Sequence, residues 1–180
     1  MEEGAALGKN HILEPISKRD TSGLKHRDLR LKLREVKPQF IYIHLGVNDI
    51  LNGHSVEETM QNFTEFLSFR DSYVPNAKVF ISLPLPTMRR NYSEYNNKII
   101  DLRDEIQNLY NMHNPSSRKP IAKCKLLLNT NDNLARDGKL KREFCSNDDL
   151  HLSDKGKAAI LGNFRHHIHG LARSLIGNRN

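Results

Sequence analysis

Three short apolar runs, separated by longer amphipathic segments, set the order of elements along the chain. The runs are FIYIHLG at 40–46, KVFISLPLP at 78–86 and CKLLLN at 124–129. A short run that is apolar on both faces is typical of a strand in a parallel sheet, which helices cover on both sides. Pro84 and Pro86 end the second run, because proline cannot donate a hydrogen bond to a neighbouring strand. We therefore predict three buried strands.

Apolar residues at helical spacing predict a helix after each strand. The first opens with a Ser-x-x-Glu capping box formed by Ser55 and Glu58. The second spans 93–113 and ends before NPSSRKP. Ser153 or Asp154 caps the third. The positions expected to be buried are Val56, Met60, Phe63 and Leu67 on the first helix, Ile99, Leu102, Ile106, Leu109 and Tyr110 on the second, and Ile160, Phe164, Ile168, Leu171 and Leu175 on the third.

The first forty residues allow two interpretations. HILEPIS at 11–17 has the composition of a short strand. SGLKHRDLRLKLREVKP at 22–38 fits an amphipathic helix, but Leu29, Leu31 and Leu33 also alternate as they would in a strand. We favour the helix, because the Lys-Pro pair at its end then makes a tight turn into the first apolar run.

The order strand, helix, strand, helix, strand, long loop, helix indicates right-handed β-α-β crossovers and a parallel sheet. The segment from Thr130 to Asp149 is polar and contains an Asp-Gly turn, so we predict a long surface loop there. A length of 180 residues fits one domain. We expect a single domain over residues 1–180, with 1–10 disordered and 176–180 as a tail.

The formal net charge of +7 is unevenly distributed, since nine Lys/Arg and four Asp/Glu lie between Lys9 and Lys37. Such a stretch is either an electrostatic footprint for nucleic acid or the solvated face of an amphipathic helix. The absence of interleaved aromatic residues favours the solvated face.

No apolar run approaches the ~20 residues of a membrane span, and no secretory signal is visible. Cys124 and Cys145 lack C-x-x-C spacing, so we expect reduced thiols and a cytoplasmic or nuclear protein.

Gly46-Val47-Asn48-Asp49 follows the first predicted strand. Ligands of an open parallel sheet bind beyond the carboxyl ends of its strands. Glycine there allows the backbone to approach closely, and the Asn48 amide can donate a hydrogen bond to a developing negative charge. A turn that starts the next helix would use the same residue types, so the motif alone leaves both interpretations open.

Asp148 lies three residues before His151, just ahead of the last predicted helix. A catalytic histidine needs a partner that fixes its tautomer and stabilises the imidazolium, and a hydrogen-bonded carboxylate does both. A surface histidine near a helix-capping aspartate is the alternative interpretation of this spacing.

In this order and on these elements, the two motifs resemble the SGNH hydrolase family, also called GDSL esterases, over Ser22 to Leu175. The motifs are most similar to esterase-like domains of LINE-type retrotransposon proteins. The resemblance implies a three-layer α/β/α sandwich with a parallel flavodoxin-like sheet, and hydrolysis of small carboxylic or acetyl esters without a metal or other cofactor. By resemblance, the Gly23 N–H and the Asn48 side chain would bind the oxyanion, His151 would be the general base, and Asp148 would orient it.

The chain departs from the family in its first motif, because Gly-Asp-Ser, which carries the nucleophilic serine, occurs nowhere in the sequence. The sole Asp-Ser pair, Asp71-Ser72, follows the Asn48 motif and is predicted to end a helix. The residues before Gly23 suffice for one short strand, so we expect a sheet truncated at the N-terminus, in a fragment or degenerate copy of a longer reading frame. Ester hydrolysis should then be strongly impaired. The alternative is a non-catalytic module that binds nucleic acid or a protein partner through the basic N-terminal region.

Overall fold

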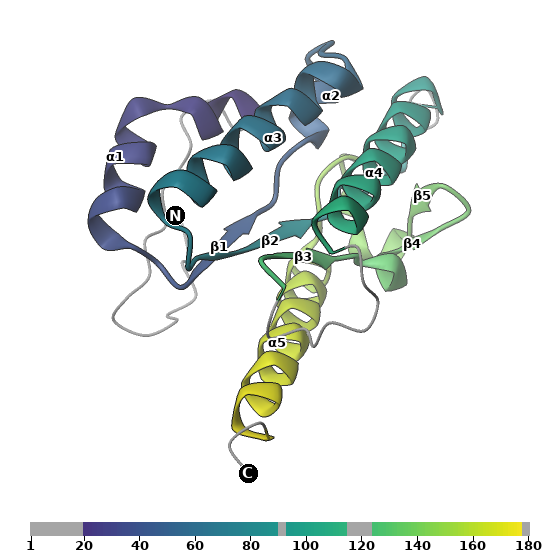
Figure 1. Ribbon diagram of the computed structural model, residues 1–180. Coiled ribbons are helices and arrows are strands. Elements are labelled where there is room, and N and C mark those ends of the chain that lie inside the picture. Colours follow the sequence, from purple (N-terminus) through teal and green to yellow (C-terminus); the bar gives the residue numbers. More distant parts are fainter. Residues whose placement is uncertain (1–19, 90–92, 115–123, 178–180) are drawn as a thin grey trace.

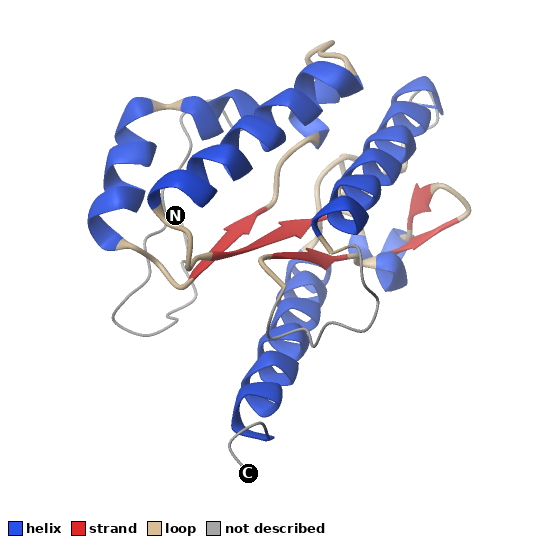
Figure 2. Ribbon diagram, in the orientation of Figure 1, coloured by secondary structure: helices blue, strands red, loops and turns tan. Residues whose placement is uncertain are grey.

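The computed structural model describes residues 20–89, 93–114 and 124–177, with side chains described as far as residue 170. Three parallel strands form the central sheet, in the order β1 (Phe40–Ile43), β2 (Lys78–Ser82) and β3 (Leu126–Asn129) (Figures 1 and 2). Each lies within one of the predicted apolar runs, so the predicted parallel sheet is confirmed. The predicted strand at 11–17 lies outside the described residues.

β1 is less buried than its sequence suggests. We expected a strand covered on both sides, but only Ile43 of its four residues is buried, and Phe40 is 39% exposed. Among the described residues β1 pairs with β2 alone, with Phe40 opposite Lys78 and Ile43 opposite Ile81. β1 is therefore the edge strand of the described sheet, which explains its exposure.

Helices cover both faces of the sheet, as a three-layer α/β/α sandwich requires (Figure 1). Two long helices, α3 (Val56–Tyr73) and α4 (Ser93–His113), pack on one face around Val79 and Ile81 of β2. The other face carries Phe80 and Leu127, which pack against α5 (Asp154–Gly177). The mixed α/β class predicted from the sequence is thus confirmed.

The helix termini follow the predicted capping signals. Ser55 Oγ accepts a hydrogen bond from the Glu58 N–H at 3.1 Å, and the Glu58 carboxylate accepts one from the Ser55 N–H at 2.9 Å, which completes the capping box. At the start of α5, the Gly156 N–H donates to Ser153 Oγ at 3.2 Å, so Ser153, the first of the two candidates, is the cap.

The predicted helix at 22–38 is present but divided. A short 3₁₀ helix, η1 (Thr21–Lys25), precedes α1 (Arg27–Val36). Lys37 then adopts a left-handed conformation, with φ of 49°, and its N–H donates to Leu33 O at 2.9 Å. This is the expected tight turn before β1. Leu33 is the buried residue of α1, whereas Leu31 and Val36 are largely exposed.

The predicted burial stripes are largely observed. Phe63 and Leu67 of α3, four of the five positions of α4, and Ile160 of α5 are buried, while Val56, Met60 and Tyr110 are partly buried against the core. Phe164 and Ile168 of α5 pack against the second face of the sheet. The side chains of Leu171 and Leu175 lie outside the described residues.

The segment from Thr130 to Asp149 is not simply the surface loop that we expected. It contains two 3₁₀ turns, η4 (Asp132–Leu134) and η5 (Arg142–Phe144), and a short antiparallel hairpin of β4 (Ala135–Arg136) and β5 (Lys139–Leu140). Leu134, Leu140 and Cys145 are buried in a small apolar cluster with Ile160 of α5. These apolar residues are isolated among polar ones, so no periodic pattern marks them.

Candidate active site

The carboxyl ends of the three parallel strands lie at one edge of the sheet, because the register aligns Ile43 with Ile81 and Ser82 with Asn129. Asn48 lies in the segment that follows β1, and His151 lies in the segment between β5 and α5. Segments that follow neighbouring parallel strands can bring their side chains together at this edge. The candidate site is built here.

Gly46 turns the chain at the end of β1. Its φ is 116°, which L side chains rarely adopt, and a Cβ atom there would lie 2.9 Å from Leu102 Cδ2 of α4. The backbone conformation therefore favours glycine, and a larger residue would also have to displace the end of the Leu102 side chain. The turn leads into the short helix α2 (Val47–Leu51), in which Asn48 is exposed near the first turn.

Asp49 joins the Asn48 segment to the segment that carries Gly23. Its buried carboxylate accepts hydrogen bonds from the Thr21 N–H, at 3.1 and 3.0 Å to the two oxygens, and from the Thr21 hydroxyl. The Asn62 amide of α3 donates to the same hydroxyl at 2.8 Å. Gly23 is buried two residues further along η1, so the structure brings its segment beside the Asn48 turn.

The Gly23 N–H is engaged within its own turn. It donates to Asp20 O at 3.2 Å, and the Asp20 carboxylate in turn accepts from the Ser22 N–H at 2.9 Å and from the Ser22 hydroxyl. An oxyanion at this position would have to displace the Asp20 carbonyl. The side chain of Asn48, the second candidate donor, is exposed in the segment that follows β1.

The Asp148 carboxylate organises the turn that carries His151. One oxygen accepts from the Leu150 N–H at 3.0 Å, from the His151 N–H at 2.9 Å and from the Ser146 hydroxyl. The other oxygen contacts His151 Nδ1. The hydrogen bond with His151 and then that with Ser146 hold the pKa of Asp148 well below its usual range. The carboxylate thus stays ionised beside the imidazole.

One backbone and one side-chain hydrogen bond fix this turn to the segment that follows β2. The Met88 N–H donates to Asp149 O at 3.0 Å, and Arg89 Nε donates to Asp148 O at 3.1 Å. Within the turn, the Ser146 N–H donates to His151 O at 2.8 Å. These bonds hold the His151 turn against the segment that follows the carboxyl end of β2, and the His151 side chain is exposed.

No nucleophile contacts the His151 ring within the described residues, where Asp148 is its hydrogen-bond partner. Two serines of the His151 and Gly23 turns are engaged elsewhere: the Ser146 hydroxyl donates to Asp148, and the Ser22 hydroxyl donates to Asp20. Cys145 is buried, and this burial, together with the Asp149 carboxylate, raises the pKa of its thiol, which makes it a poor nucleophile at neutral pH. The residues described here also contain no cluster of three or more His, Cys, Asp or Glu that could hold a metal ion.

A polar hollow of about 270 Å³ opens beside the end of β3. The Asn131 amide at its base donates to Ser82 Oγ at 2.8 Å, and Asn163 of α5 donates to Asn131 Oδ1 at 3.1 Å. The Oδ1 atom of buried Asn129 has no hydrogen-bond partner among the described residues. The sequence did not single out these asparagines. The signal available was their clustering at 129–133, directly after a buried strand.

A family comparison identifies the chain. The model of the GDSL-like lipase/acylhydrolase family matches residues 4–159. The chain belongs to this family. Its relation to LINE-type retrotransposon domains stays a prediction. No curated protein matches the sequence significantly.

Solved structures share the fold at low sequence identity. A carbohydrate esterase family 3 protein from Talaromyces cellulolyticus is 15% identical, with a TM-score of 0.67 over 86% of this chain and 68% of that one. An acetyl esterase mutant crystallised with an acetate ion is 16% identical, with a TM-score of 0.67 over 87% and 69%. A GDSL-like lipase from Bacteroides thetaiotaomicron is 18% identical, with a TM-score of 0.62 over 84% and 72%. The chain therefore has the GDSL esterase fold.

No helix within its described residues has the length and apolar character needed to cross a membrane.

Proposed function

We propose that this domain is built for the hydrolysis of small carboxylic or acetyl esters. His151 would act as general base, Asp148 would hold the imidazole in the required tautomer, and the Asn48 amide would stabilise the oxyanion. The observation that carries the proposal is the contact of Asp148 with His151 Nδ1, in a turn that is hydrogen-bonded to the segment following β2. Asn48 follows the neighbouring strand β1, so the proposal places its amide at the same edge of the sheet. The family membership and the esterase fold support the substrate class.

The proposal includes strong impairment of the reaction in this 180-residue chain, because Gly-Asp-Ser is absent from its sequence. An oxyanion donor and a base without their nucleophile leave only weak catalysis, about 10³–10⁴-fold over water in a serine hydrolase that has lost its triad. A serine supplied by another segment would restore the reaction. The outer edge of β1, which is unpaired among the described residues, is where a further parallel strand could bring that serine beside Asn48.

Hydrolysis of p-nitrophenyl acetate tests the proposal. We expect slow turnover that falls in His151→Ala to a residual rate above the rate of buffer, because the Asn48 donor remains. It should also fall in Asn48→Ala, because an oxyanion donor typically contributes about 10²–10³-fold. His169→Ala is the matched control, since His169 is an exposed histidine of α5 outside the site, and it should leave the rate unchanged. Turnover that survives His151→Ala, or that falls equally in His169→Ala, would remove His151 from the mechanism.

A second candidate function, nucleic-acid binding through the basic N-terminal region, requires neither a base nor a nucleophile. One type of contact that could not be predicted from the sequence supports nucleic-acid binding. Arg30 and Arg34 of α1 stack on the aromatic rings of Phe69 and Tyr73, which belong to α3. The basic helix therefore does lie among aromatic residues, although they come from a segment far along the chain.

A further inference from the structure

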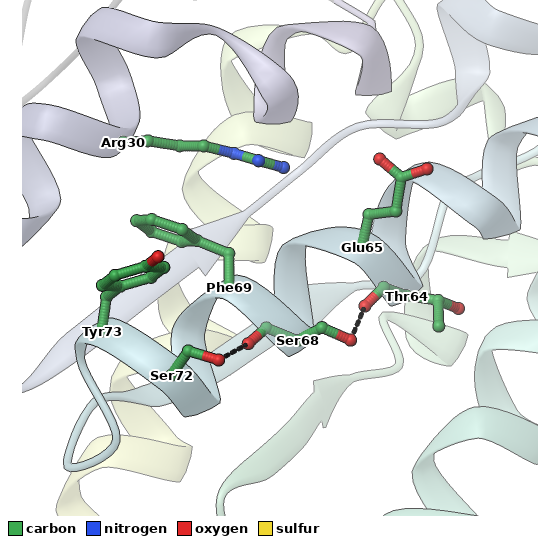
Figure 3. Close-up of a pocket in the computed structure, with 7 residues that line it drawn as sticks. All are labelled: Arg30, Thr64, Glu65, Ser68, Phe69, Ser72 and Tyr73. Atoms are coloured by element: carbon green, nitrogen blue, oxygen red, sulfur yellow. Dashed lines mark hydrogen bonds between the residues drawn. The ribbon is translucent and has the colours of Figure 1, made fainter.

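A groove of about 370 Å³ runs between α1 and α3, on the side of the molecule formed by the basic helix (Figure 3). Arg30 of α1 extends above Phe69, and α3 supplies the opposite wall with its aromatic and hydroxyl side chains. The groove involves none of the residues of the candidate active site. Its residues are Arg30, Thr64, Glu65, Ser68, Phe69, Ser72 and Tyr73.

Two guanidinium groups lie over the aromatic wall. The Cζ atom of Arg30 is 5.1 Å from the centroid of the Phe69 ring, and that of Arg34 is 4.6 Å from the centroid of the Tyr73 ring. Arg30 Nε donates to Leu24 O at 3.2 Å, whereas its Nη2 has no hydrogen-bond partner among the described residues. The aromatic rings hold both cations in place, and the Nη2 atom of Arg30 is buried rather than open to a ligand.

The hydroxyl groups of the groove are arranged as acceptors. Thr64, Ser68 and Ser72 each donate their hydroxyl hydrogen to the carbonyl four residues earlier in α3, at 3.0 Å. Two of these bonds are drawn in Figure 3. Each oxygen therefore presents lone pairs to the groove, along about 12 Å of helix. These oxygens would accept from amino, imino or hydroxyl groups of a ligand and would not bind an anion.

The charge around the groove is positive. Lys25, Arg27, Lys32, Arg34 and Lys37 are exposed on or beside α1, where Asp28 and Glu35 are the opposing carboxylates. Glu65, the acidic residue of the groove itself, is paired with Lys25 at 3.2 Å. A ligand for this groove must therefore combine negative charge with flat rings and hydrogen-bond donors.

We propose that the α1–α3 groove binds single-stranded nucleic acid. Phosphates would lie against Arg30 and the exposed cations of α1, bases would stack on the guanidinium and aromatic planes, and base or sugar donors would meet the hydroxyl oxygens of α3. An acidic peptide would satisfy the charges, and its backbone N–H groups could reach the hydroxyl oxygens, but its carboxylate side chains would not use the planes. This inference rests on the second candidate function proposed above and is independent of ester hydrolysis, since the groove shares no residue with the candidate active site.

Fluorescence anisotropy with a labelled oligouridine and the full chain tests the inference. We expect the double variant Arg30→Gln, Arg34→Gln to weaken binding roughly tenfold and to reduce the slope of log K against log salt by about 0.7 for each phosphate that the protein no longer neutralises. The matched control is Arg136→Gln, Lys139→Gln on the β4–β5 hairpin, which removes the same charge from exposed positions elsewhere. It should change the affinity little.

The aromatic wall is tested separately, because removal of charge alone does not distinguish a groove from a diffuse basic surface. Tyr73 is 51% exposed, so its truncation should not unfold the domain. Tyr73→Ala should weaken binding about fivefold or more, while Tyr73→Phe, which keeps the ring, should bind like the unchanged chain. Neither variant should alter p-nitrophenyl acetate hydrolysis.

Three outcomes would overturn the inference. The first is an equal loss of affinity in the groove pair and in the hairpin pair, which would indicate non-specific charge. The second is unchanged binding in Tyr73→Ala. The third is displacement of the oligouridine by polyglutamate at equal charge concentration, which would make the groove a site for acidic peptides.

Discussion

A buried carboxylate is costly unless hydrogen bonds replace its hydration, and Asp49 receives such bonds from the backbone and side chain of Thr21. The sequence drew attention to the neighbouring Asn48 as the chemical group. Asp49 has a structural role, because its hydrogen bonds with Thr21 fix the segment of Gly23 against the Asn48 turn. Its partner lies 28 residues away, so no local pattern could have revealed the contact. The Asp148–His151 contact spans three residues and was predictable for that reason.

The ionisation of Asp148 gives a test at this scale. The hydrogen bond with His151 is the largest cause of its lowered pKa. A lowered folded-state pKa means that the stability contributed by the carboxylate is present above the ordinary aspartate value, near 3.9, and is lost only as the pH falls through the lowered pKa. NMR titration should therefore find Asp148 still ionised at pH 4, where an ordinary aspartate is about half protonated. In His151→Ala its pKa should move back up, and protonation near pH 4 in the unchanged chain would contradict the contact.

Gly46 offers a second test. Gly46→Ala should lower the free energy of unfolding by about 1–3 kcal/mol for the backbone strain alone, with an added penalty for the contact with Leu102. Gly162→Ala is the matched control, because Gly162 lies in α5 and nothing lies within 4 Å of the position of its Cβ. It should stabilise the helix by up to about 1 kcal/mol. Urea unfolding measures both changes, and equal effects would show that Gly46 has no special role.

At the scale of elements, local sequence patterns correctly predicted the features that depend on neighbouring residues. The capping box, the proline-terminated strand and the helical stripes depend on neighbours within one or two turns, and they matched the structure. Two predictions failed because they concern distant partners. The apolar residues of β1 could not show that the strand lies at an edge, and the isolated Leu134 and Leu140 could not show that α5 would cover them.

The folded character of the segment at 130–149 is testable through Leu134, which is fully buried. Leu134→Ala should cost about 2–5 kcal/mol of unfolding free energy, as truncation of a core leucine does. Leu161→Ala is the control, because Leu161 is 38% exposed on α5 and its truncation should cost far less. If both changes proved nearly neutral in urea unfolding, the segment would be the mobile surface loop that its composition suggested.

At the scale of the whole molecule, β2 is the centre on which both layers depend. Val79 and Ile81 face α3 and α4, and Phe80 faces α5, with exposures of 0 to 1%. The groove between α1 and α3 is a property of this scale as well. The charge of α1 was visible in the sequence, but its aromatic partners are contributed by α3.

Hydrogen exchange should reflect this arrangement. The amides of β2 are expected to exchange slowest in the described sheet, at the free energy of global unfolding, since strands pair with β2 on both sides. Exchange monitored by NMR or mass spectrometry checks this order. Protection of β1 amides equal to that of β2 would indicate that another strand covers the outer edge of β1.

That outer edge also affects how the protein behaves in concentrated solution. FIYI in β1 has high β-propensity and no charge, and its first residue is 39% exposed. Unpaired backbone groups next to such a sequence form a template for adding strands from other molecules. Wherever no further strand protects this flank, self-association rather than unfolding would limit the concentration at which the protein can be handled.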